Sequence, residues 1–97
     1  MLFSVTWEFV DTSEEGSKRA LELFAKWQPP ETAAIQGFYA NADNSGGLMI
    51  VDVPDHGTVA KLTATWVPWL HFIATPILPI EEGTGLAGAA VAWRAAN

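Results

Sequence analysis

Apolar and polar residues alternate along the first segment of the chain, from Leu2 to Val10. One side of this segment carries Phe3, Val5, Trp7 and Phe9, and the other side carries Ser4, Thr6 and Glu8. A period of two is typical of a strand with one buried face and one solvated face. The pattern therefore predicts a half-buried strand at the start of the fold.

The next segment follows a helical period instead. Thr12 can cap a helix, and Glu15, three residues later, can close a capping box. Apolar residues then recur at helical spacing until Pro29 and Pro30, which stop the helix because a residue before proline avoids the helical conformation. We therefore expect a helix over about residues 13–28.

A hairpin is predicted in the middle of the chain. Residues 34–40 and 48–53 are apolar runs of strand length, and the segment between them, residues 41–47, is rich in Asn and Gly. A short polar connection between two strands favours antiparallel pairing.

A second helix is expected to follow this hairpin. Asp55 can cap it, and apolar residues then recur at helical spacing. Pro68 should end or kink the helix near Trp66 or Val67.

The rest of the chain predicts one more strand and a helical tail. Residues 71–78 have strand character, and Pro76 and Pro79 indicate an edge position or an early exit from the sheet. Residues 83–96 are rich in alanine, and we expect them to form a short helix packed on the body.

The predicted order is β-α-β-β-α-β with a C-terminal helical appendage. This is an α+β, ferredoxin-like split βαβ arrangement, with a four-stranded antiparallel sheet and two helices on one face. At 97 residues the chain forms a single domain, residues 1–97. Because the strands are apolar on both sides and two helices cover one face, we expect a homodimer through sheet faces, which closes a dimeric α/β barrel.

Composition and charge exclude several kinds of function. The net charge is −6, which argues against a nucleic-acid or anionic-membrane partner. There are 5 Lys and Arg residues, which disfavours a polyanionic ligand. The chain lacks cysteine and holds 2 isolated histidines, so no metal or cofactor is expected.

No targeting or membrane segment is expected. The first residues lack a basic region, and Glu8 interrupts their apolar run. Residues 62–80 carry no formal charge, but three prolines interrupt this stretch. These features favour a cytoplasmic location.

Several strand and aromatic motifs resemble a known family. The motifs are Val5-Thr6-Trp7-Glu8-Phe9, Gly37-Phe38-Tyr39, Gly46-Gly47, Met49-Ile50-Val51-Asp52, the pair Trp66 and Trp69, and Pro76-Ile77. Over roughly residues 2–80 they resemble small bacterial proteins of domain-of-unknown-function family 3303, in the dimeric α/β-barrel superfamily. The resemblance implies the ferredoxin-like fold and a face-to-face dimer. It implies no activity.

Candidate site residues are mostly aromatic. Indole and phenol rings can pack in the core or line a cleft for a flat ligand. The residues expected to line such a cleft, between sheet and helices, are Trp7, Tyr39, Trp66, Trp69 and His71. The first hypothesis is that the protein binds a small apolar or aromatic ligand there.

Two alternatives stay open. His71 or Asp52 could act as a base in a cofactor-free monooxygenase or isomerase of the antibiotic-biosynthesis type. His71 could equally be a hydrogen-bonded histidine at a strand end, and Asp52 could lie at the wet end of its strand. The third hypothesis is a non-catalytic interaction module, in which every tryptophan serves packing and no cleft of ligand size exists.

Overall fold

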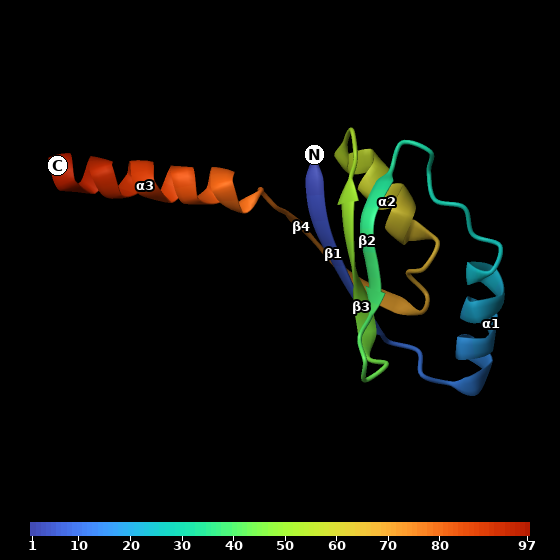
Figure 1. The fold of residues 1–97 in the computed structure, drawn as a ribbon. Helices are drawn as coiled ribbons and strands as arrows, with labels where there is room; N and C mark the ends of the chain where they lie inside the picture. Colours follow the sequence, from blue (N-terminus) through green and yellow to red (C-terminus); the bar gives the residue numbers. More distant parts are fainter.

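The strands and helices follow one another in the predicted ferredoxin-like order. The computed structural model describes residues 1–97. Its elements are β1 (Leu2–Phe9), α1 (Glu14–Phe24), β2 (Ala34–Ala40), β3 (Gly46–Asp52), α2 (His56–Ala64), β4 (Leu70–Pro76) and α3 (Ile80–Ala96). The four strands pair antiparallel in the order β2-β3-β1-β4, and α1 and α2 lie on the same side of the sheet (Figure 1). The split βαβ prediction is confirmed.

The core lies between the centre of the sheet and α2. Val5 of β1 and Val51 of β3 are fully buried, and Phe3 stands directly opposite Val51 in the register. From α2, Val59 and Leu62 close over these strand residues. The alternation in β1 therefore sets the buried face as expected, because residues two apart on a strand share one face.

The start of α1 differs from the prediction. Ser13, not Thr12, is the N-cap, and its hydroxyl accepts a hydrogen bond from the Gly16 amide at 3.0 Å. Ser13 is itself held by Asp11, whose carboxylate accepts from the Ser13 hydroxyl and amide at 2.7 and 3.0 Å. With Ser13 as cap, Glu15 is one position too early to close a capping box.

The end of α1 also differs. The helix ends at Phe24, four residues before the expected limit, and the chain continues in tight turns to Trp27. Trp27 folds back to stack on Phe24, with ring centroids 6.1 Å apart. Packing of this ring replaces the last helical turn, because burial of an indole outweighs a few exposed helical hydrogen bonds.

The cap of α2 is confirmed. The Asp55 carboxylate accepts from both the hydroxyl and the amide of Thr58, each at 2.8 Å. The Thr58 hydroxyl hydrogen bond, followed by the amide hydrogen bond, holds the pKa of Asp55 below its ordinary value. The cap is therefore in its charged, accepting form at neutral pH.

The predicted edge position of β4 is confirmed, whereas the predicted packing of the C-terminal helix is wrong. β4 is an edge strand, as Pro76 indicated. The tail, however, forms a helix of 17 residues that begins at Ile80, projects from the body and buries none of its residues (Figure 1). Packing on the body was the wrong expectation, because α1 and α2 already cover the helix side of the sheet. Neither α3 nor any other helix combines the length and apolar composition needed to cross a membrane.

The second face of the sheet, here called the open face, carries no helix. The register places Ile50 of β3, Thr6 of β1 and Ile73 of β4 on this face. Ile50 is half-buried and Ile73 is 58% exposed. The open face is thus a mixture of apolar and polar side chains rather than a second apolar layer.

Candidate functional site

A large cleft lies between α1 and the helix side of the sheet. Its volume is about 870 Å³, and 15 of its 23 lining residues are hydrophobic. The cleft is lined by residues of α1, of the strands, of the segment that joins α2 to β4, and of the β2–β3 turn. A cleft of this size and composition falls within the range of small-molecule sites, roughly 300–1,000 Å³.

Some of the lining residues on facing elements have small side chains or none. Gly16 and Ala20, one helical turn apart on α1, line the cleft, and so do Ala40 and Gly46 at the ends of β2 and β3. None of these four positions carries a side chain long enough to bridge α1 and the sheet. The helix is held instead by aromatic residues nearer its C-terminal end.

These rings form one continuous group, which we call the aromatic cluster. Its members are Trp7, Phe24, Trp27, Phe38, Trp66 and Trp69. Phe24 of α1 contacts Phe38 of β2 edge to face, with centroids 6.1 Å apart. It also contacts Trp66, at 5.9 Å. The aromatic cluster therefore joins α1 to both the sheet and the end of α2.

Parts of the aromatic cluster remain open to the cleft. Phe24 is 50% exposed and Phe38 is 42% exposed, whereas Trp66 is buried. Leu21, on the same helix, is 70% exposed. Large apolar side chains at this level of exposure leave surface that a ligand can cover.

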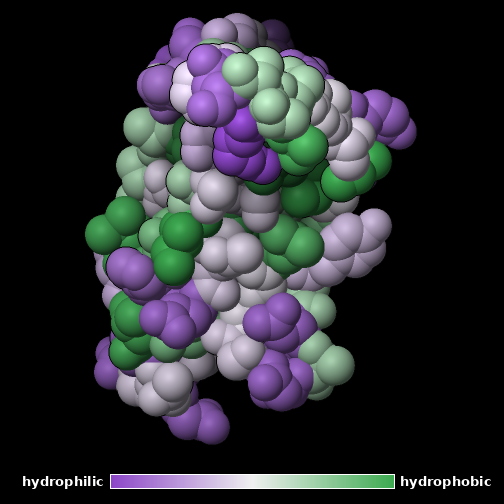
Figure 2. All heavy atoms as spheres, turned by 90° about the vertical axis from the view of Figure 1, so that its left-hand side faces the viewer, coloured by the Kyte–Doolittle hydropathy of each residue, from purple (hydrophilic) through white to green (hydrophobic).

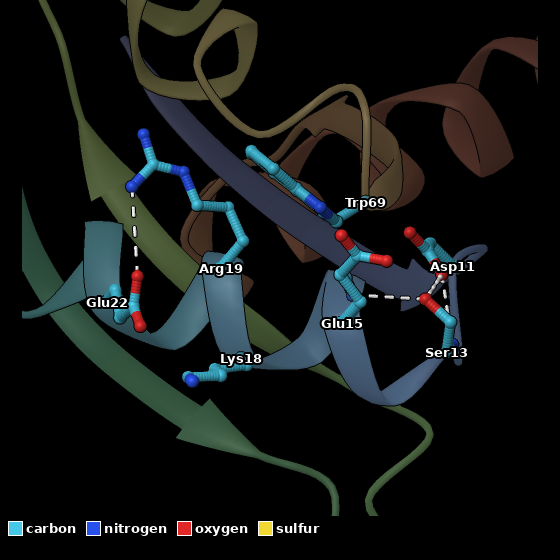
Figure 3. A pocket seen from close by; sticks show the side chains of 8 residues that line it. Asp11, Ser13, Glu15, Lys18, Arg19, Glu22 and Trp69 are labelled. Atoms are coloured by element: carbon cyan, nitrogen blue, oxygen red, sulfur yellow. Dashed lines mark hydrogen bonds and ion pairs between the residues drawn. The ribbon is translucent and has the colours of Figure 1, made fainter.

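A polar hollow of about 480 Å³ adjoins one end of the cleft (Figure 3). Asp11, Gly16 and Trp69 line both spaces, so the two are adjacent. The hollow also receives charged side chains from α1, namely Glu15, Lys18, Arg19 and Glu22. Hydrogen bonding by the Ser13 hydroxyl, and then by the Ser13 amide, lowers the pKa of Asp11, so its carboxylate is ionised at neutral pH.

Three of the expected ligand-binding residues lie together in the cleft: Trp7, Trp66 and Trp69. Tyr39 also borders the cleft, but it pairs with Leu48, and the strand alternation turns its side chain toward the open face. It is 64% exposed.

The two catalytic candidates lie elsewhere. His71 stands opposite Glu8 in the register and therefore belongs to the open face, outside the cleft. Asp52 is at the exposed end of β3, where its carboxylate pairs with the N-terminal ammonium of Met1 at 3.0 Å. Neither side chain meets the other or the aromatic cluster.

The sequence interpretation missed Phe24, Phe38 and Asp11 as site residues. Phe24 falls in the predicted helix over residues 13–28 and Phe38 in the predicted strand over residues 34–40, and neither position by itself indicates a cleft. A usable signal was Ala20, a small residue on the inward face of the predicted helix, where it leaves room against a sheet.

Comparison with known proteins gives one match. The family model described as a domain of unknown function, DUF3303, matches residues 1–91. No curated protein and no solved structure matches the chain. The matched region includes the whole sheet, α1, α2 and most of α3. The chain therefore belongs to the DUF3303 family, a domain family of unknown function.

Proposed function

We propose that this protein binds a small, largely apolar or aromatic molecule, without covalent chemistry, in the cleft between α1 and the sheet. The observation that carries the proposal is the cleft itself, about 870 Å³ and predominantly hydrophobic. The aromatic cluster supplies flat surfaces for a planar ligand, which favours offset or edge-to-face stacking.

The cleft favours this function over the two alternatives. An interaction module needs no internal cavity, whereas this cleft is large enough for a drug-sized molecule. A cofactor-free monooxygenase or isomerase needs a base beside its substrate. His71 and Asp52, the residues suggested for that role, both lie outside the cleft.

The Phe38→Ala variant tests ligand binding. We expect it to weaken binding of indole, a neutral flat probe, about tenfold, because it removes a half-exposed ring from the wall of the cleft. Isothermal titration calorimetry measures the affinity, and native mass spectrometry of the purified protein shows whether a ligand is already bound. Trp93→Ala is the control, because Trp93 is an exposed ring on α3 outside the cleft. If indole does not bind to the wild-type protein and no ligand co-purifies with it, the proposal is refuted.

We also propose that the protein is a homodimer through the open face. Figure 2 shows apolar and pale side chains on this side of the molecule, with strongly hydrophilic ones among them, and α3 projects from the same side of the sheet in Figure 1. A second copy stacked on the open face would lie beside α3. This contact would stabilise a helix that contains Gly83, Gly85 and Gly88 and has no tertiary support of its own.

The Ile73→Lys variant tests the dimer. Ile73 lies on the open face of β4, so lysine there would place two charges in a desolvated, two-fold symmetric contact. We expect the dimer dissociation constant to rise at least about 100-fold, measured by sedimentation equilibrium. Val67→Lys is a matched control, because Val67 is equally exposed, at 60%, but lies outside the sheet. A monomeric wild-type protein, or equal association of both variants, would contradict the dimer.

A further inference from the structure

The charged groups around the cleft are distributed unevenly, and this bears on which ligand it takes. Among the lining residues only Glu8 and Asp11 are charged, and no lysine, arginine or histidine lines the cleft. Glu8 pairs opposite His71 on the open face, so strand alternation points its side chain away from the cleft. Asp11 is therefore the carboxylate at the end of the aromatic cluster.

Hydrogen bonds from Ser13 hold the ionised carboxylate of Asp11 beside the first turn of α1. Its Oδ1 atom accepts both hydrogen bonds from Ser13, at 2.7 and 3.0 Å. Its Oδ2 atom lies against Gly16, where a Cβ atom would collide with it. Gly16 thus makes room for the carboxylate beside the first turn of α1, and Oδ2 makes no hydrogen bond within the chain.

The neighbouring hollow adds a second carboxylate. In Figure 3 the side chains of Glu15 and Asp11 both extend toward the side of α1 on which Trp69 lies, whereas Lys18 extends away from Trp69. Arg19 extends on the same side of α1 as Trp69 in Figure 3, and its guanidinium pairs with Glu22 at 3.8 Å. Asp11 and Glu15 form no ion pair with a basic side chain of this chain, and both line the hollow together with Trp69.

An indole face and adjacent carboxylates are the groups that recognise an organic cation. Tryptophan gives the strongest cation–π attraction of the aromatic side chains, and hydrogen bonds to a charged group are stronger than neutral ones. The net charge of −6 also favours encounter with a cation. An aromatic body would occupy the cleft while its ammonium group met Asp11 at the mouth.

Resting on the proposed ligand-binding function, we propose that the cleft selects arylalkylamines, which are aromatic molecules that carry an ammonium group on a short chain. Asp11, Glu15 and Trp69 recognise the cation, and the aromatic cluster receives the ring. A neutral analogue keeps the ring contacts alone. An anionic analogue meets repulsion at the mouth of the cleft.

Three probes that share a phenyl ring and a similar reach test this selectivity: phenethylamine, 2-phenylethanol and 3-phenylpropionate. We expect the amine to bind at least about tenfold more tightly than the alcohol, and the carboxylate to bind most weakly. Isothermal titration calorimetry at low and high salt measures the affinities. The advantage of the amine should shrink as salt screens the charges.

Two pairs of variants assign the effect to the named carboxylates. Asp11→Asn should reduce the affinity for the amine to about that for the alcohol, with the alcohol unchanged. Asp43→Asn is the matched control: Asp43 makes the same two hydrogen bonds, to Ser45, and lies outside both spaces. Glu15→Gln should weaken amine binding, whereas Glu14→Gln, in the same helical turn but outside the hollow, should not.

The outcomes separate this inference from the function on which it rests. Equal binding of all three probes, with no effect of Asp11→Asn, overturns cation selectivity and leaves ligand binding in place. Failure of all three probes and of indole to bind overturns the proposed function itself. Loss of alcohol binding in Asp11→Asn would show that the substitution disturbs the cleft. The effect of Glu15→Gln on amine binding then decides whether a carboxylate selects the cation.

Discussion

Replacing Trp66 by alanine is expected to lower the free energy of unfolding by about 3–5 kcal/mol. Trp66 is 7% exposed and is the only ring that contacts Phe24, Trp27 and Trp69 at once, with centroids 5.7–6.4 Å apart. Its loss leaves a cavity where α1 meets α2. The total free energy of unfolding of a small domain is roughly 5–15 kcal/mol, so Trp66→Ala would remove much of the stability.

Chemical denaturation measures this effect, and amide hydrogen exchange locates it. Exchange should rise most in α1, because the aromatic cluster is its main attachment to the body. Trp66→Phe keeps a ring in place and should lower the free energy of unfolding clearly less. Trp69→Ala removes a half-buried indole and should also cost less. Equal losses for Trp66→Ala and Trp69→Ala would mean that Trp66 is not the centre of the cluster.

Gly46→Ala is the second variant with a large expected effect. A Cβ atom on Gly46 would collide with the main-chain carbonyl oxygen of Trp7 and approach its carbonyl carbon to 2.8 Å. Gly46 pairs with Glu8 at the end of the β1–β3 ladder, so the obstacle is backbone that no rotamer change can move. We expect a loss of about 3 kcal/mol or more and a disturbed register at this end of the sheet.

Thermal unfolding and the amide NMR shifts of β1 and β3 measure the response. Gly57→Ala is the matched control, because a Cβ there would meet only the Asp55 carboxylate, at 3.4 Å, near the start of α2. Alanine at this helical position should be neutral or should stabilise by up to about 1 kcal/mol. If both alanine variants melt alike, close approach at Gly46 does not control strand pairing.

Much of the fold could be predicted because its signals are local. The period of two in β1 identified the buried face, since each strand residue points opposite to its neighbours. Asp55 identified the start of α2, and Pro76 identified an edge strand. The cap of α1 was misplaced by one residue, because Thr12 and Ser13 are adjacent and both can accept the capping hydrogen bond.

The site could be predicted only in part. Trp7, Trp66 and Trp69 reach the cleft, but their sequence positions do not reveal whether an indole packs or lines a space. Whether His71 belongs to the cleft or to the open face depends on its register with β1, where it stands opposite Glu8. Register is a long-range property, and a shift of one residue would move every side chain of the strand to the other face.

The sequence by itself determined the element order, the antiparallel sheet, the buried face of β1 and the excess of acidic charge. Each depends on hydrophobic period, on turn residues or on composition, and none needs knowledge of distant contacts. Only the tertiary structure decided that α3 stands away from the body and that a cleft lies between α1 and the sheet. A cleft is the space between elements far apart in the chain, so it exists only once they have packed.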